Sequence, residues 1–185
     1  MNTPRLAITS LFSLLLIASC KQASQTGPES VTTTKPILTT TPLHNLNFDL
    51  DGDAKSDYLF EFTGWYTATI PPSYAWVLFV NALDSNQVQN SSLRGTLPIG
   101  EYVPISDTSG WNHYSQGLAA SVNGSPWTGR FVKTTAQILG FRLSRQGSYY
   151  YGWVTLSIED DGSLSIFDFA ISKSADTPIR AGIHA

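Results

Sequence analysis

Residues 149–159 read Tyr-Tyr-Tyr-Gly-Trp-Val-Thr-Leu-Ser-Ile-Glu, and residues 163–172 read Ser-Leu-Ser-Ile-Phe-Asp-Phe-Ala-Ile-Ser. Aliphatic residues recur at every second position in the first run, which is the period of a β-strand. Asp160-Asp161-Gly162 lies between the runs. Because Asp-Gly tolerates the positive φ of a two-residue hairpin loop, the stretch predicts two antiparallel strands joined by a tight turn.

The alternation also predicts which side chains share a face. In the first strand, Val154, Leu156 and Ile158 lie opposite Trp153, Thr155 and Ser157. The second strand is apolar on both faces, with Leu164, Ile166 and Ala170 on one and Phe167, Phe169 and Ile171 on the other. A strand that is apolar on both faces is covered on both faces or packs at an edge between sheets.

Further strands are predicted upstream of this hairpin. Residues 56–63 alternate, residues 74–83 form a long apolar run typical of a central strand, and residues 131–132 and 138–143 are shorter candidates. Residues 86–125 are rich in loop signals, and long irregular stretches in a compact domain are usually functional or poorly ordered. The pattern predicts an all-β fold, a two-sheet antiparallel sandwich of jelly-roll or concanavalin-like type with long loops.

The composition of the chain limits the kinds of partner that it can bind. Charged residues make up only 14% of the chain, aromatic residues make up 12%, and the net charge is −3. Without a basic cluster, this balance argues against nucleic acid as a partner. Residues 45–185 amount to one domain, which can bury about two-thirds of its unfolded surface without disulfides.

The first nineteen residues predict a signal peptide. A basic start is followed by an apolar stretch from Leu6 to Ile17, which is too short to span a bilayer. The closing residues, Ile17-Ala18-Ser19-Cys20, resemble the lipobox of bacterial lipoproteins. The resemblance implies cleavage before Cys20 and attachment to its thiol of a diacylglyceryl group, whose acyl chains growth with labelled palmitate would mark. The alternative is an ordinary signal peptide with an incidental cysteine.

Residues 20–44 are rich in Ser, Thr, Gln and Pro and predict a disordered tether or a ragged domain terminus. Lys21 follows the cysteine, so the aspartate associated with inner-membrane retention in enterobacteria is absent. We therefore expect a lipid anchor in the cell membrane or outer membrane, facing the periplasm or the exterior.

A group of aspartates gives the strongest chemical signal: Asp49, Asp51, Asp53 and Asp57 fall within nine residues. Clustered carboxylates repel one another unless a cation neutralises them. Calcium takes six to eight oxygen ligands, and the backbone carbonyl of Lys55 stands at the seventh position of the loop. The alternative is a solvated acidic turn. We therefore expect a structural calcium ion as cofactor.

The same loop resembles the Asp-x-Asn/Asp-Gly-Asp-x-x-x-Asp loop of FG-GAP-type extracellular calcium repeats. Carried over by position, that resemblance implies four side-chain ligands: Asp49, Asp51, Asp53 and Asp57. A second resemblance is to exported bacterial β-sandwich proteins. It rests on Tyr151-Gly152-Trp153-Val154, the strand around Asp168, and Pro178-Ile179-Arg180-Ala181-Gly182. This resemblance implies the sandwich fold and no single activity.

No catalytic motif is present. A Ser/His/Asp set can be written from His113 with Asp107 upstream. Proximity in the sequence does not identify a triad, because triads are recognised by geometry. The candidates for a glycosidase pair are matched by residue type alone: Glu61, Glu101, Glu159 and Asp168.

Aromatic residues in or beside loops favour binding instead, to a glycan or a protein: Trp65, Tyr66, Tyr74, Trp111, Tyr114 and Trp127. Their alternative role is to cover the ends of the core. The sequence predicts a non-enzymatic envelope lipoprotein with a binding or structural role. The alternatives are a lectin-like glycan-binding module and a small carbohydrate-active hydrolase.

Overall fold

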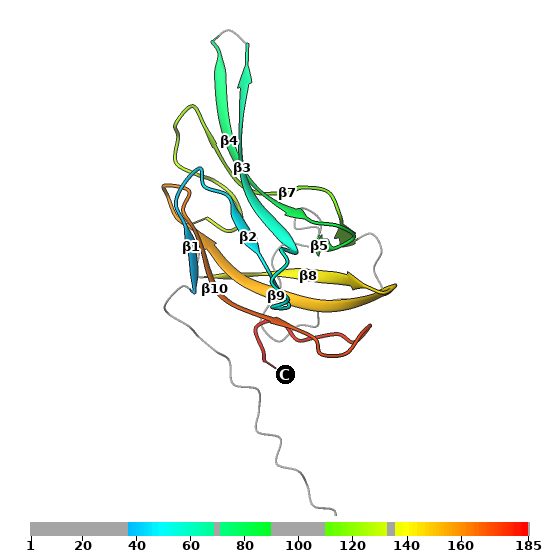
Figure 1. Ribbon diagram of the computed structural model, residues 1–185. Helices are drawn as coiled ribbons and strands as arrows, with labels where there is room; N and C mark the ends of the chain where they lie inside the picture. Colours follow the sequence, from blue (N-terminus) through cyan, green and yellow to red (C-terminus); the bar gives the residue numbers. More distant parts are fainter. Residues whose placement is uncertain (1–36, 69–70, 90–109, 133–135, 185) are drawn as a thin grey trace, which may run out of the picture.

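The computed structural model describes residues 37–68, 71–89, 110–132 and 136–184 (Figure 1). Ten strands lie in this part of the chain: β1 (Leu38–Thr40), β2 (Leu46–Phe48), β3 (Tyr58–Thr67), β4 (Ser73–Ala82), β5 (Gln87–Gln89), β6 (Trp111–Asn112), β7 (Gln116–Val122), β8 (Gln137–Arg145), β9 (Ser148–Ile158) and β10 (Leu164–Ile171). No α-helix occurs among these described residues. The all-β prediction is confirmed.

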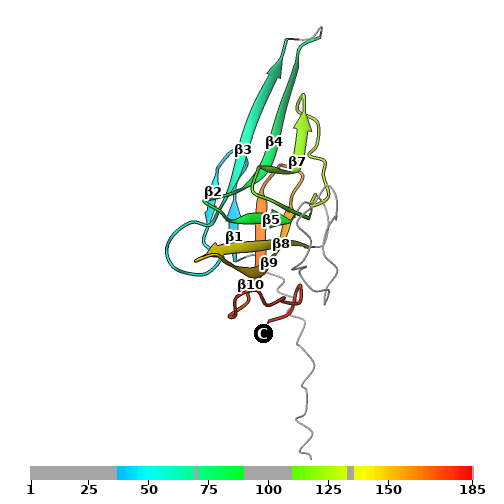
Figure 2. The same ribbon diagram turned by 90° about the vertical axis from the view of Figure 1, so that its right-hand side faces the viewer.

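The strands form two packed sheets. One has six strands in the order β1-β10-β9-β8-β5-β6, and the other has four in the order β2-β3-β4-β7. Neighbouring strands are antiparallel throughout both sheets. The two views in Figures 1 and 2 show the sheets stacked at the base of the molecule, which confirms the predicted β-sandwich.

The β9–β10 hairpin has the predicted pairing but a different turn. Leu164 pairs with Ile158, and the N–H of Glu159 donates to the carbonyl of Ser163 over 2.9 Å. This leaves residues 160–162 as a three-residue loop, with Gly162 at a φ of 88°. The predicted two-residue loop is therefore wrong. Glycine in the left-handed region after two turn residues is the usual closure of a three-residue hairpin.

The predicted faces of β10 change halfway along the strand. The register shifts between Ile166 and Asp168, so a β-bulge inserts one extra residue there. Beyond the bulge, Phe169 packs on the same core as Ile166, whereas Ala170 packs on the opposite face. The prediction that Ala170 shares a face with Ile166 is wrong, because a bulge resets the two-residue alternation.

The main hydrophobic core lies between the sheets. Each sheet contributes alternating side chains to it, among them Tyr58, Phe60 and Phe62 from β3 as predicted. The phenol of buried Tyr58 crosses the core and donates to the backbone carbonyls of Gln87 and Arg142 over 3.2 and 3.0 Å. Burial raises the pKa of Tyr58 well above its usual value, so the phenol keeps the proton that it donates.

A second cluster covers the outer face of the six-stranded sheet. Its buried residues come from three strands and from the C-terminal segment: Trp111, Ile138, Tyr151, Trp153, Ile179 and Ala181. The strand β9 therefore has apolar neighbours on both faces, and its central residues are buried. Residues 131–132 form no strand; Val132 makes a single parallel bridge to Ile158.

The folded chain begins before the boundary predicted at residue 45. Leu38–Thr40 forms β1 and pairs with Leu164–Ile166 at the edge of β10. Backbone pairing to an open sheet edge needs little apolar side-chain burial, and a composition-based boundary does not detect it. The predicted signal peptide, Cys20 and residues 21–36 of the predicted tether lie outside the described residues, as do residues 90–109 of the loop-rich middle.

The β3–β4 hairpin projects beyond the sandwich in both views (Figures 1 and 2). Its pairing continues to Thr67 opposite Ser73, far past Phe60, whose pairing with Leu46 is the last between β2 and β3 in this direction. Within the part of the chain that the structure describes, no helix has the length and apolar character needed to cross a bilayer.

Candidate functional site

The aspartate loop lies between β2 and β3, where the chain turns back on itself. The N–H of Asp57 donates to the carbonyl of Phe48 over 2.9 Å and closes the loop at its base. Leu50, which stands between two aspartates, is 1% exposed and belongs to the main core. One buried apolar side chain therefore fixes the loop to the sandwich while the neighbouring carboxylates face outward.

Backbone N–H groups organise the first half of the loop. Asp49 accepts hydrogen bonds from the N–H of Gly52 and of Ala54 over 2.7 and 2.8 Å. Gly52 has a φ of 78°, a conformation that glycine adopts without strain. Asp side chains that accept from the following backbone are a recurrent turn device.

Asp57 is the buried member of the group. It is 1% exposed, and its Oδ2 accepts the N–H of Leu50 over 2.9 Å. Its Oδ1 accepts from the guanidinium of Arg145 over 2.6 Å and from Asn86 Nδ2 over 3.3 Å. Both oxygens of this buried carboxylate therefore have hydrogen-bond donors within the fold.

Three carboxylates come together at this point. One oxygen from each of Asp49, Asp51 and Asp57 lies within 4.8 Å of the others, so the group can hold a metal ion. Arg145 also bridges two of them, since its guanidinium is 3.0 Å from Asp51 and 2.6 Å from Asp57. Burial opposes the charge of Arg145, but the hydrogen bonds and charges of Asp57 and Asp51 outweigh it and raise the pKa of Arg145.

Sequence reasoning missed Arg145 and Asn86. Arg145 ends β8 and lies 88 positions beyond Asp57 in the chain. Asn86 lies between β4 and β5, and its Oδ1 accepts the N–H of Ser144 over 2.9 Å. No local pattern marks either residue, because their role depends on which strands the fold places beside the loop.

The structure keeps two predicted ligands apart from the cluster. Asp53 Oδ1 accepts the N–H of Lys55 over 2.8 Å, and Asp53 is exposed. The ammonium group of Lys55 pairs with Asp84 at 2.6 Å, while its carbonyl remains the predicted ligand atom. The described geometry therefore assembles three of the four predicted carboxylates.

The predicted binding aromatics divide into two groups. Trp65, Tyr66 and Tyr114 are exposed, with fractions of 50%, 67% and 68%. Trp111 and Trp127 are 7% and 8% exposed, so the prediction that they bind a ligand at the surface is wrong for both. For these two, the alternative role of covering the core applies.

The contacts of Trp111 and Trp127 explain why both rings are buried. Trp127 packs edge-on against Phe62, and a Cβ placed on Gly162 would come within 2.5 Å of its indole ring. Trp111 stands in the outer cluster, where the guanidinium of Arg142 lies 4.8 Å from its ring centroid. Both rings fill space that long-range packing creates.

The candidate acid–base residues are spread over separate elements. Glu61 in β3 accepts Asn81 Nδ2 over 2.7 Å, and Glu159 stands in the β9–β10 turn. Asp168, beside the bulge of β10, lies 3.0 Å from His184 Nε2. His113 contacts the ring of Tyr114, and both are exposed. Glu101 and Asp107 lie outside the described residues.

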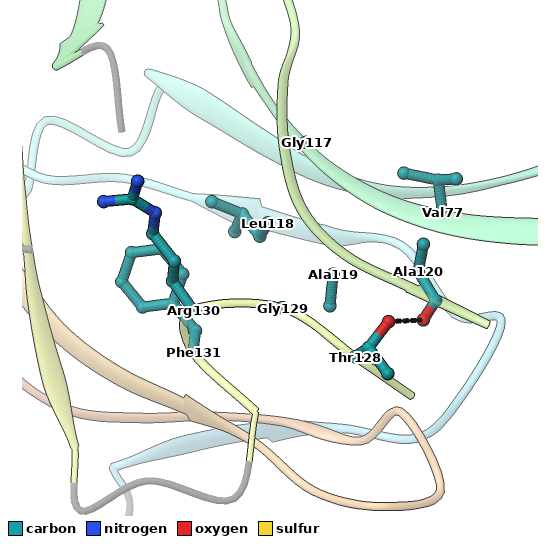
Figure 3. A pocket seen from close by; sticks show the side chains of 9 residues that line it. All are labelled: Val77, Gly117, Leu118, Ala119, Ala120, Thr128, Gly129, Arg130 and Phe131. Atoms are coloured by element: carbon teal, nitrogen blue, oxygen red, sulfur yellow. Dashed lines mark hydrogen bonds between the residues drawn. The ribbon is translucent and has the colours of Figure 1, made fainter. Parts of the chain in front are cut away.

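A hollow of about 390 Å³ opens between β4, β7 and residues 128–131 (Figure 3). It is lined by Val77, Gly117, Leu118, Ala119, Ala120, Thr128, Gly129, Arg130 and Phe131. Arg130 is the one charged residue in this lining. The hollow therefore offers apolar contact and one guanidinium, and its lining has no acid–base pair.

Comparison of the chain with protein-family models, with curated proteins and with solved structures found no match in any of the three.

Proposed function

We propose that this chain is an exported, lipid-anchored protein of the cell envelope, that calcium braces its β-sandwich, and that it acts by binding rather than by catalysis. The observation that carries the proposal is the convergence of Asp49, Asp51 and Asp57 at the start of β3. Through Arg145, these carboxylates connect the start of β3, a strand of the projecting hairpin, to the end of β8.

The donor set suits calcium in its chemistry. Calcium is a hard cation that prefers carboxylate and carbonyl oxygens, and it tolerates flexible geometry with water in part of its shell. Each carboxylate oxygen has two lone pairs, so the backbone hydrogen bonds to Asp49 leave acceptor capacity for a cation. Asp53 would join as a fourth carboxylate if it released the N–H of Lys55, whose carbonyl supplies a further oxygen.

Melting of the purified full chain, measured in calcium and in a chelator, tests the calcium site. We expect calcium to raise the melting temperature with an affinity of about 0.1–1 mM, the range of extracellular modules. Asp51→Ala abolishes the increase. Asp161→Ala, in the β9–β10 turn, is the matched control and keeps it. Identical curves in calcium and chelator for the parent chain would reject calcium as the cofactor.

Growth with labelled palmitate tests the anchor. The parent chain is expected to incorporate label, and Cys20→Ala is expected to lose it and to leave the membrane fraction. More than one acyl chain is needed for stable anchoring, since a single chain gives reversible attachment. Equal labelling of the two forms would eliminate the lipoprotein proposal while leaving the calcium site untouched.

The binding role is supported by the exposed aromatic side chains on the projecting hairpin. Trp65, Tyr66 and Tyr74 are 50%, 67% and 39% exposed, and all three stand on β3 or β4. Exposed aromatic groups gathered on one element of an otherwise well-packed domain favour an interaction surface.

A further inference from the structure

The projecting part of the β3–β4 hairpin and the neighbouring strand β7 carry no charged side chains. The sequence contains no Lys, Arg, Asp or Glu from Phe62 to Leu83, nor from Tyr114 to Gly129, although such residues make up 14% of the chain. The first run contains the projecting parts of β3 and β4, and the second contains β7. Asn123, just after β7, binds Tyr74 through its backbone N–H and its Oδ1 over 2.7 and 2.8 Å. The two uncharged runs therefore meet beside the hairpin.

Aromatic side chains stand on both faces of the hairpin. Tyr66 pairs with Tyr74, and the preceding pair along the ladder is Trp65 with Ala75. Because successive side chains of a strand point to opposite faces, Trp65 lies on one face and the two tyrosines lie on the other. Trp65 packs against Phe79 with ring centroids 5.5 Å apart, and Tyr74 packs against Trp76 at 5.2 Å.

This two-faced arrangement distinguishes between kinds of partner. A rigid protein or a sugar ring docks on one face and leaves the other in water. A lipid surface surrounds a projecting hairpin and contacts both faces. Trp and Tyr are the residues enriched at the membrane–water interface, where the ring is in an apolar environment and the polar atom stays hydrated. Because the projecting part of the hairpin carries no charged side chain, its rings can settle at this boundary without bringing a charge toward the hydrocarbon, where the cost is large.

We propose that the projecting part of the β3–β4 hairpin docks into the headgroup region of a lipid bilayer through Trp65, Tyr66 and Tyr74. The inference deepens the binding role proposed above and rests on it for the nearby membrane. Beyond Phe60, β3 has no partner strand on its outer side among the described residues. The outward N–H of Phe62 donates to Asn45 Oδ1 over 3.1 Å. Nearer the tip, no described strand lies beside the outward edge of β3, so the docking depth is the interface, where water reaches the backbone, and not the hydrocarbon core.

The predicted anchor permits this orientation. Residues 21–36 separate Cys20 from the first described residue, Ile37. Sixteen fully extended residues reach about 55 Å. That reach allows the sandwich to turn its hairpin toward the bilayer that holds the lipid, so one membrane serves both contacts.

The test uses the full chain with its one cysteine replaced, Cys20→Ser, and a single new labelling site, Tyr66→Cys, that carries an environment-sensitive fluorophore. Vesicles of phosphatidylcholine are added with and without a lipid-borne quencher. We expect the fluorophore emission to shift to shorter wavelength and to be quenched from the lipid. The reference chain carries the fluorophore on Thr177→Cys, in the C-terminal segment at the opposite end of the molecule, and it shows neither change (Figure 1).

Variants then assign the response to the aromatic groups. Trp65→Ser with Tyr74→Ser is expected to reduce the emission shift several-fold. Tyr114→Ser removes an equally exposed aromatic group outside the hairpin and leaves the shift unchanged. The N-terminal segment is the same in every chain, so differences between them report the hairpin. Circular dichroism of each variant confirms the folded sandwich.

Three results would overturn the proposal: no vesicle response at position 66; an emission shift that grows with protein concentration without vesicles, indicating a second copy; or a shift produced by glycans but not by vesicles. Each is distinct from failure of the proposed function. Palmitate labelling and the calcium-dependent melting temperature would remain intact if only the hairpin inference failed. Both would be absent, with the vesicle response present, if only the anchor and cofactor proposals failed.

Discussion

The β3–β4 hairpin begins beside Asp57, where a buried carboxylate receives hydrogen bonds from Leu50, Asn86 and Arg145. Its other end carries Trp65 and Tyr66, which are at least half exposed. The same two strands therefore have a base held by ionic hydrogen bonds and a projecting end supported by aromatic pairs. At the base, the carboxylate of Asp57 is buried and bonded within the fold, whereas the projecting end leaves large aromatic side chains in solvent.

Stability and interaction are located at opposite ends of this hairpin. The base joins the two sheets, because Arg145 ends β8 of the six-stranded sheet and Asp57 precedes β3 of the four-stranded sheet. The projecting end pairs within its own sheet and bonds the turn after β7 through Tyr74 and Asn123. We expect changes at the base to alter the free energy of unfolding, and changes at the projecting end to alter binding.

The largest expected effect is from Asp57→Asn. The substitution keeps the shape of the side chain but removes the negative charge that pairs with Arg145. It also replaces one hydrogen-bond-accepting oxygen with an NH₂ group, which then faces a donor group of the fold. Breaking a buried pair from one side costs about 3 kcal/mol. Urea unfolding in chelator measures it. Asp53→Asn, in the same loop but exposed, is expected to change the free energy by less than about 0.5 kcal/mol. Equal effects of the two substitutions would contradict the buried role of Asp57.

Arg145→Met is expected to destabilise the chain by about 2 kcal/mol in chelator, because it removes hydrogen bonds to two carboxylates. Calcium is then expected to raise the melting temperature more than in the parent chain, since the ion would replace the lost positive charge between Asp51 and Asp57. Arg130→Met, at an exposed arginine of the hollow, changes neither quantity. An Arg145→Met chain with no calcium response would show that the guanidinium and the ion act together rather than in exchange.

The strands of this hairpin could be predicted from the sequence because their signal is local. Tyr58, Phe60 and Phe62 alternate with more exposed neighbours, and their burial follows from the two-residue period. The aspartate spacing was similarly local, and three of its four carboxylates converge. Arg145 could not be predicted, because nothing near Asp57 in the chain specifies that the end of β8 lies beside it.

The errors in the sequence predictions have the same origin. Trp127 stands in a Gly-Ser-Pro context that is typical of a surface loop, yet Gly162 and Phe62 make the space that its ring fills. The bulge in β10 moves Ala170 to the other face, and no residue around it signals the extra insertion. Local patterns indicated the long strands β3, β4, β8, β9 and β10 but not the short edge strand β1. Contacts between distant residues decide which aromatic groups remain exposed.

Trp65→Ser tests the projecting end of the comparison. Trp65 is half exposed and has one aromatic partner, so its removal is expected to cost less than about 1 kcal/mol of unfolding free energy. Phe62→Ala, in the same strand but buried, is the matched control and costs about 3 kcal/mol. Urea unfolding of both variants gives the contrast. A loss at Trp65 as large as that at Phe62 would mean that the projecting end belongs to the folding core.

The smallest expected effect lies at the exposed rim of the base, where Lys55 pairs with Asp84. The hydrogen bond from Lys55, followed by its charge, lowers the pKa of Asp84, and the same contact raises the pKa of Lys55. The lowered pKa of Asp84 stabilises the fold above the unfolded pKa of about 3.9, and this stabilisation is lost as the pH falls through the folded pKa. The raised pKa of Lys55 stabilises the fold below the unfolded pKa of about 10.4, and this stabilisation is lost as the pH rises through the folded pKa.

Asp84→Asn is therefore expected to lower the melting temperature slightly near pH 7 and to leave it unchanged at a pH below the folded pKa of Asp84. Because both side chains are largely exposed, salt at 1 M screens the pair and removes the difference at neutral pH. Melting curves at neutral and acidic pH, each at low and high salt, measure this. A difference that persists in acid or in high salt would show that Asp84 acts through packing of the β4–β5 turn and not through its charge.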